Sequence, residues 1–152
     1  MAVDIITSTL IHRPRDEVAA FSGDPTNAPR WYVNIKSIEW KTPPPLRLGS
    51  QLDFVAQFLG RRLAYTYEVI TLVPGSTLTM RTAQGPFPME TTYRWESEGE
   101  GRTKMTLRNR GEPAGFSKLF APLMASAMRR ANEKDLAKLK ALLEERSPVG
   151  LK

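Results

Sequence analysis

Two tyrosines separated by one residue, Tyr65 and Tyr67, are the side chains in this sequence best suited to orient a polar group of a ligand. Alternate residues of a β-strand point to the same face, so the two hydroxyls would lie side by side. A buried tyrosine hydroxyl needs a hydrogen-bond partner, which a ligand can supply. The next candidates are Asn109, near the end of a later strand, and Trp31, which we expect at the mouth of a pocket.

The other predicted contacts are apolar or aromatic and follow the same alternation. Methionines at 80, 89, 124 and 128 would give an adaptable lining, although methionine also fills gaps in an ordinary core. The full set predicted to bind a ligand is Trp31, Phe54, Tyr65, Tyr67, Met80, Phe87, Tyr93, Trp95, Asn109, Phe120 and Met124. Phe87 stands between two prolines that restrict its backbone, so we expect it at the rim of the cavity or over the sheet edge.

Catalytic groups are scarcer than binding groups. The chain has no cysteine and one histidine, which excludes thiol nucleophiles, thiolate metal sites and clusters of several histidines. His12 lies beside the Pro14 breaker, and we expect it on the surface. No Ser-His-Asp arrangement, phosphate-binding glycine loop or dinucleotide fingerprint is present. We therefore assign no catalytic residue, metal or cofactor, and a reaction would depend on pocket shape and on a Tyr or Asn that polarises a carbonyl.

The net charge of +6 comes from the C-terminal third of the chain. There the basic residues alternate with acidic ones, which is typical of a solvated helix face. Nucleic acid is therefore not the partner that we expect. The alternative is a continuous basic patch of Arg129, Arg130 and Lys134 that binds RNA with a steep dependence on salt.

Periodicity and turn residues predict the elements that must position these side chains. A strand over Val3–Ile11 is followed by a short helix over Pro14–Phe21 and by a helical turn over Thr26–Trp31, for which Asp24 is a candidate N-cap. Six further strands are predicted, at Ile35–Lys41, Ser50–Leu59, Leu63–Val73, Thr77–Ala83, Met89–Ser97 and Thr103–Gly111. Their short connections indicate an antiparallel meander.

The last predicted element is a long helix over Gly115–Arg146, with a bend expected near Pro122. Its apolar residues form two sets on a helical wheel, which a bend or a wide contact arc would reconcile. These sets are Phe116, Phe120, Leu123 and Ala127, and Leu136, Leu139 and Leu143. Only this helix is long enough to cover the apolar face of the sheet, and a bent sheet around one helix would leave a cavity between them.

The length of 152 residues predicts a single domain over residues 1–152. The N-terminus carries Asp4 in place of basic residues, and no apolar run approaches the roughly 20 residues that a membrane span needs. We therefore expect a cytoplasmic protein without a membrane span. Whether it forms a homodimer stays open.

The order and spacing of several short motifs resemble the START/Bet v 1-like (SRPBCC) superfamily, in particular its polyketide cyclase/dehydrase-type branch. The motifs are Arg13-Pro14 with Val18 and Phe21, Asp24-Pro25, Arg30-Trp31, Leu48-Gly49, Gly101 with Thr103, and the helix that ends over Asp135–Glu144. The resemblance implies an α+β helix-grip fold, in which a curved seven-stranded antiparallel sheet wraps around a long C-terminal helix, with two short helices between strands 1 and 2. Members include cyclases, lipid or hormone binders, quinone-binding proteins and ribosome-associated proteins.

Three functions follow from the residues and the resemblance together. The first is binding of a small hydrophobic molecule, such as a lipid, a quinone or a polyketide-like compound, between the sheet and the C-terminal helix. The second is a polyketide cyclase or dehydratase, for which Tyr65→Phe and Tyr67→Phe should abolish turnover while binding survives. The third is a ribosome- or RNA-associated protein that acts through the basic C-terminal helix.

Overall fold

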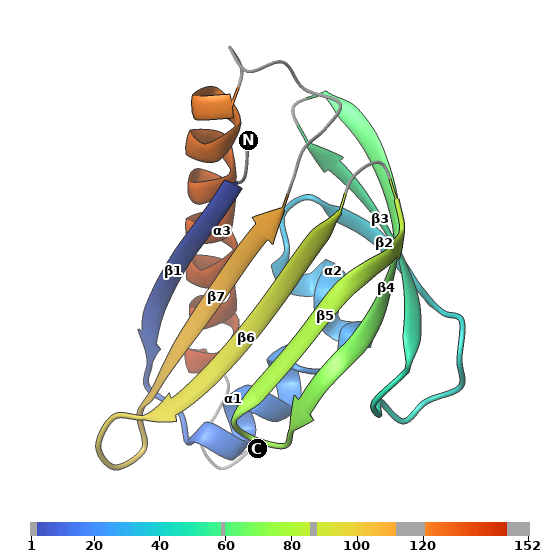
Figure 1. Ribbon diagram of the computed structural model, residues 1–152. Helices are drawn as coiled ribbons and strands as arrows, with labels where there is room; N and C mark the ends of the chain where they lie inside the picture. The colour runs from blue at the N-terminus through green and yellow to red at the C-terminus, as the bar shows by residue number, and fades with distance from the viewer. Residues whose placement is uncertain (1–2, 59, 86–87, 112–120, 146–152) are drawn as a thin grey trace.

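The computed structural model describes residues 3–58, 60–85, 88–111 and 121–145. Seven strands form an antiparallel sheet in the order β1-β7-β6-β5-β4-β3-β2, which curves in front of the long helix α3 (Figure 1). The strands are β1 (Val3–Ile11), β2 (Ile35–Trp40), β3 (Gln51–Phe58), β4 (Arg61–Val73), β5 (Thr77–Gln84), β6 (Met89–Ser97) and β7 (Thr103–Gly111). The predicted α+β architecture is confirmed, and β1, β6 and β7 have the predicted bounds.

Three short helical segments connect β1 to β2, namely α1 (Arg15–Ser22), the 3-10 turn η1 (Pro25–Asn27) and α2 (Ala28–Trp31). The side chain of Asp24 accepts a hydrogen bond from the backbone N–H of Thr26 at 3.0 Å, so the predicted N-cap is confirmed. The indole Nε1 of Trp95 donates to the Ser22 hydroxyl at 2.9 Å. This bond fastens α1 to the concave face of β6.

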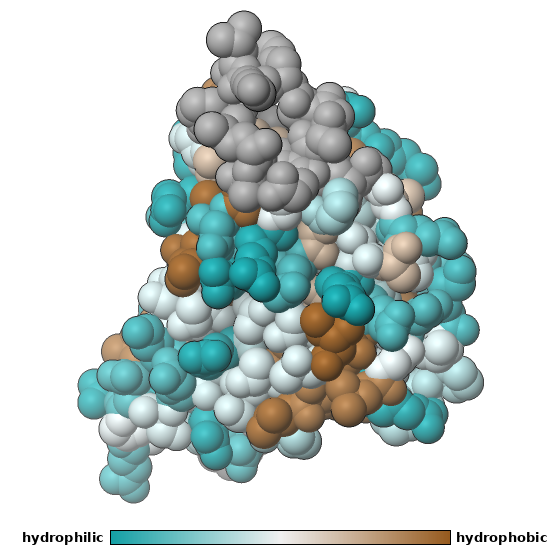
Figure 2. All heavy atoms as spheres, in the orientation of Figure 1, coloured by the Kyte–Doolittle hydropathy of each residue, from teal (hydrophilic) through white to brown (hydrophobic). Residues whose placement is uncertain are grey.

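The convex face of the sheet carries a row of residues with alternating charge. In register across five strands lie Asp4, Arg110, Glu90, Arg81 and Glu68. Opposite charges on neighbouring strands stabilise a sheet, and here Arg110 contacts Glu90 at 3.2 Å. Hydrophilic side chains cover much of this face (Figure 2). The buried apolar residues of the same strands lie on the concave side, toward α3, whereas Ile6 of β1 lies on the convex side and is 52% exposed.

The described part of the last helix is α3 (Ala121–Glu144), which packs along β1 (Figure 1). A single stripe of its residues is buried, at the three- and four-residue spacing of one helix face. The stripe consists of Met124, Met128, Asn132, Asp135, Leu136, Leu139 and Leu143. Leu123, a member of the first predicted apolar set, does not pack on the sheet as that set was expected to, because its side chain is 55% exposed. Phe116 and Phe120 lie outside the described residues, as does most of the segment in which a bend was expected.

The C-terminal end of α3 is fastened to the end of β1 by Glu144. Its carboxylate accepts hydrogen bonds from the backbone N–H of His12 (2.7 Å) and from Lys140 Nζ (2.6 Å), and it lies 2.9 Å from His12 Nδ1. Burial opposes ionisation, but these bonds outweigh it and lower the pKa of Glu144 to about 2. His12 itself is exposed, as predicted. None of the helices in the described residues is long and apolar enough to cross a membrane.

Candidate ligand-binding pocket

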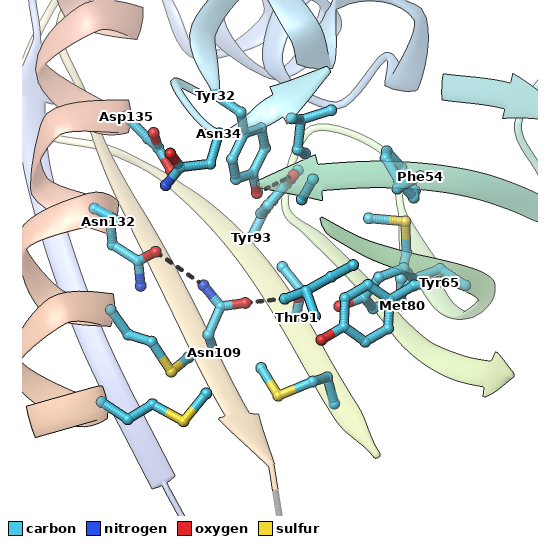
Figure 3. Close-up of a pocket in the computed structure, with 18 residues that line it drawn as sticks. Tyr32, Asn34, Phe54, Tyr65, Met80, Thr91, Tyr93, Asn109, Asn132 and Asp135 are labelled. Carbon is cyan, nitrogen blue, oxygen red and sulfur yellow. Dashed lines mark hydrogen bonds between the residues drawn. The ribbon is translucent and has the colours of Figure 1, made fainter. Parts of the chain in front are cut away.

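A cavity of about 150 Å³ lies between the concave face of the sheet and α3. Six strands and the helix contribute to it, together with Tyr32 and Asn34, which lead into β2 (Figure 3). Its lining consists of Tyr32, Asn34, Ile35, Phe54, Ala56, Leu63, Tyr65, Tyr67, Met80, Met89, Thr91, Tyr93, Asn109, Met124, Met128, Ala131, Asn132 and Asp135. Most of these side chains are apolar or aromatic, so the space suits an apolar molecule with few polar atoms.

Seven of the eleven side chains predicted to contact a ligand lie in this lining. They are Phe54, Tyr65, Tyr67, Met80, Tyr93, Asn109 and Met124. Strand alternation brings the six strand residues together from β3 to β7, and the buried face of α3 adds Met124. That these residues bind a ligand stays a prediction.

The two predicted tryptophans do not line the cavity. Trp31 is fully buried, with its ring centroid 4.2 Å from that of Tyr32 and 5.7 Å from that of Tyr93, so the prediction that it stands at the pocket mouth is wrong. Trp95 belongs to the same core, beside α1. The two indole rings pack against tyrosines of the lining: Trp31 against Tyr32 and Tyr93, and Trp95 against Tyr93. Phe87 and Phe120, the remaining two candidates, lie outside the described residues.

The polar groups that sequence reasoning missed come mainly from α3 and from the segment before β2. Asn132 and Asp135 occupy the buried stripe of α3, four and seven residues after Met128. Their positions in the helical repeat are the signal that could have revealed them. Tyr32 and Asn34 carry no such signal, because they lie between α2 and β2.

A chain of hydrogen bonds crosses the cavity from the sheet to α3. Thr91 Oγ1 donates to Asn109 Oδ1 at 2.6 Å, and Asn109 Nδ2 donates to Asn132 Oδ1 at 3.2 Å (Figure 3). On the sheet side, the hydroxyl of Tyr67 also bonds to Thr91. The chain therefore ends at the amide of Asn132, whose Nδ2 is buried and has no hydrogen-bond partner among the described residues.

A second polar pair joins Tyr32 and Tyr93, whose hydroxyl oxygens lie 2.6 Å apart. Burial disfavours the phenolate and raises the pKa of both side chains above the usual range. Burial likewise raises the pKa of Tyr67 to about 12. These tyrosines are therefore neutral at physiological pH and act as hydrogen-bond donors and acceptors, not as bases.

Asp135 is the acidic side chain of the lining, and only 3% of it is exposed. Its Oδ1 accepts a hydrogen bond from the backbone N–H of Val33 at 2.8 Å. Burial raises the pKa of this carboxyl to about 7, against the weaker opposing effects of the Val33 bond and the charge of Lys138. A protonated carboxyl can donate a hydrogen bond or a proton, so the pocket holds a candidate general acid.

Tyr65 and Tyr67 lie next to each other in the lining, as predicted, with ring centroids 5.7 Å apart. The ring of Phe54 meets that of Tyr67 edge to face at 5.6 Å. Behind Tyr65 lies Gly85, where a β-carbon would come within 2.5 Å of Tyr65 Cδ1. The absence of a side chain at position 85 therefore allows the Tyr65 ring its present position.

A family model described as "Polyketide cyclase / dehydrase and lipid transport" matches residues 2–144. The chain belongs to this family. No curated protein matches the chain in sequence. The predicted resemblance to the polyketide cyclase/dehydrase-type branch is thus confirmed. The helix-grip architecture that this resemblance implied is the one that the structure has.

Three solved structures share the fold of this polyketide cyclase/dehydrase-type chain at low sequence identity. Protein TTHA0849 from Thermus thermophilus has a TM-score of 0.81 and 20% identity, with 95% of this chain and 99% of that chain covered. The Zhui aromatase/cyclase from Streptomyces sp. R1128 has a TM-score of 0.80 and 14% identity, with 96% of each chain covered. A START superfamily protein from Mycobacterium smegmatis has a TM-score of 0.81 and 14% identity, with 95% and 99% covered.

The volume of the cavity indicates the size of ligand that this polyketide cyclase/dehydrase-type chain can enclose in this conformation. Its volume of about 150 Å³ equals that of an engineered apolar cavity that accepts benzene. One aromatic ring or a short chain fits within this volume. Across residues 3–58, 60–85, 88–111 and 121–145, no group of three His, Asp or Glu side chains is placed to hold a metal ion.

Proposed function

We propose that this chain binds a small hydrophobic molecule of about one ring in size in the cavity between the sheet and α3. The observation that carries the proposal is an apolar cavity that also contains a few converging polar groups. These groups are the Thr91-Asn109-Asn132 chain, the Tyr32-Tyr93 pair and Asp135. An ordinary core would fill such a space with side chains, because protein interiors are close-packed. The family's description, which includes lipid transport, supports the same role.

Filling the cavity tests this proposal directly. Ala131 lines the cavity from α3, and Ala137 lies on the exposed side of the same helix. Ala131→Phe should abolish ligand-induced thermal stabilisation and the ligand-bound peak in native mass spectrometry, and Ala137→Phe should leave both unchanged. The panel would contain a short fatty acid, a benzoquinone and a single-ring polyketide analogue. Failure of the wild-type protein to bind any of them, or equal binding by both variants, would overturn the proposal.

A second candidate function, dehydration of a β-hydroxyketone, rests on the carboxyl of Asp135, which lines the cavity and is partly protonated near neutral pH because burial raises its pKa to about 7. In this reaction Asp135 gives its proton to the leaving hydroxyl, the C–O bond breaks and water departs. The carboxylate then takes the proton from the adjacent carbon as the C=C bond forms, which restores the acid. A protein that shares this fold, the Zhui aromatase/cyclase, is named for reactions of this general kind.

A single-ring substrate, 4-hydroxy-4-phenylbutan-2-one, tests this second function because its product is a conjugated enone that absorbs in the ultraviolet. Asp135→Asn should abolish turnover while binding of the substrate survives. Tyr65→Phe and Tyr67→Phe test whether the two hydroxyls orient the substrate carbonyl. Unchanged turnover in Asp135→Asn would remove Asp135 from the mechanism, and no turnover in the wild-type protein would leave binding as the function.

A further inference from the structure

Only one of the two polar atoms in the side-chain amide of Asn132 has a hydrogen-bond partner among the described residues. Its Oδ1 accepts a hydrogen bond from Asn109 Nδ2 at 3.2 Å, but its Nδ2 has no partner in the part of the chain that the structure describes. The residue is 5% exposed, so bulk water does not reach this donor freely. An unpaired buried N–H group is destabilising, so this donor calls for a partner that the described residues do not supply, such as an oxygen atom of a bound molecule.

In the structure, the hydrogen-bond chain leaves the Nδ2 of Asn132 as the unpaired atom of its amide. Thr91 Oγ1 donates to Asn109 Oδ1, so the Nδ2 of Asn109 faces α3 and donates to the Oδ1 of Asn132. The Nδ2 of Asn132 is consequently directed away from this chain. Figure 3 shows the side chain projecting from α3 into the pocket, where Met124 and Met128 also lie. A thioether sulfur is only a weak acceptor, so these neighbours cannot replace a ligand oxygen.

We propose that Asn132 is the polar anchor of the pocket and that the ligand presents a carbonyl oxygen to its Nδ2. The inference rests on the proposed binding function and specifies its ligand class: a single-ring ketone, quinone or ester. A carbonyl oxygen accepts a hydrogen bond without requiring an acceptor in return, which suits a lining that is otherwise apolar. A ligand cation cannot occupy this position, because it has no lone pair for the Asn132 donor.

Two probes of nearly the same shape separate the carbonyl from the rest of the ligand. Acetophenone carries C=O where 2-phenylpropene carries C=CH2, so the ratio of their dissociation constants isolates the oxygen. In Asn132→Leu, which keeps the side-chain size, the preference for acetophenone should fall by about three- to tenfold, as expected for one neutral hydrogen bond. Met128→Leu is the matched control, since it changes the same helix face without removing a donor. Met128→Leu should change the dissociation constants of acetophenone and 2-phenylpropene by the same factor.

Infrared spectroscopy of bound 13C-labelled acetophenone provides a measurement on the wild-type protein, which is independent of how well Asn132→Leu folds. A hydrogen-bonded carbonyl should absorb at a lower frequency than the same compound in hexane. If neither probe binds, the proposed binding function fails. If both bind but the ratio is the same in Asn132→Leu, or the wild-type carbonyl absorbs as in hexane, the pocket remains a binding site and the anchor role of Asn132 is wrong.

Discussion

The carboxyl group of Asp135, in the middle of α3, accepts a hydrogen bond from the backbone N–H of Val33 at 2.8 Å. This contact joins the long helix to the segment that leads into β2, across residues far apart in the chain. It also leaves the carboxyl in an environment where burial raises its pKa to about 7. The helix is therefore connected to the pocket wall by a group that changes its charge near physiological pH.

We expect stability to fall as the pH rises, because Asp135 binds its proton more tightly in the folded chain. The group ionises near 3.8 when unfolded and near 7 when folded. Its contribution is complete below the unfolded pKa and is lost as pH rises through the folded pKa. Between about pH 5 and pH 8, urea unfolding should show a loss of roughly 2 kcal/mol in the free energy of unfolding.

The control is Asp135→Asn, which keeps an oxygen for the Val33 N–H but has no proton to lose. This variant should be more stable than the wild-type protein at about pH 8 and should lack the pH dependence in that window. A wild-type slope that survives in Asp135→Asn would assign the titration to another group.

Glu144 should produce the opposite pH dependence in acid. Its pKa falls from 4.5 in the unfolded chain to about 2 in the folded one, so its contribution is present above pH 4.5 and is lost as pH falls through the folded value. Glu144→Gln should lower the free energy of unfolding by about 1 kcal/mol at neutral pH, and the difference from the wild-type protein should shrink towards pH 2.

The neighbouring residue gives a matched control for this acid transition. Glu145 is exposed, and Glu145→Gln changes the net charge by the same amount without removing the bonds to His12 and Lys140. It should leave the urea midpoint unchanged across the same pH range. An equal loss of stability in both variants would mean that net charge, not the fastening of α3 to β1, is responsible.

Much of the fold could be predicted from the sequence because the strands carry strong local signals. Met89–Ser97 and Thr103–Gly111 alternate clearly and are separated by a glycine-containing turn, and both bounds are confirmed. The same alternation placed Phe54 and Met80 on the pocket side. Periodicity of this kind depends on neighbouring residues alone, so one sequence suffices to detect it.

The rest of the site depends on contacts between distant segments. Asn132 and Asp135 are polar, and a search for an apolar helix face passes over them, although they lie on the buried stripe. Leu123 was expected to pack on the sheet for the same reason, because its side chain is hydrophobic, but that side chain is exposed. Trp31 lies at the end of the four-residue helix α2, where no periodicity indicates the direction of a side chain. Its packing against Tyr32 and Tyr93 depends on tertiary structure.

The Tyr32 and Tyr93 hydroxyls should be coupled energetically. Because the two oxygens lie 2.6 Å apart, Tyr32→Phe or Tyr93→Phe alone leaves the other hydroxyl without this partner. Each single change should cost about 1–2 kcal/mol in the free energy of unfolding, and the double change should cost less than the sum of the two. Additive losses in urea unfolding would show that the hydroxyls act independently.

The contact between Gly85 and Tyr65 predicts a variant that alters the pocket without touching its lining. A β-carbon at position 85 would come within 2.5 Å of Tyr65 Cδ1. Because this atom belongs to a rigid ring, it can move away only if the whole ring moves. In Gly85→Ala the Tyr65 ring must therefore move. We expect acetophenone to bind several-fold more weakly, as measured by titration calorimetry, with only a modest change in the urea midpoint because Gly85 is exposed.

A double-mutant cycle separates this effect from a general disturbance of the turn. In a Tyr65→Ala background no ring stands against position 85, so Gly85→Ala should no longer change the affinity for acetophenone. Equal losses of affinity in the wild-type and Tyr65→Ala backgrounds would mean that Gly85 acts through its own backbone. A loss confined to the background that carries Tyr65 would establish that the glycine sets the position of this pocket wall.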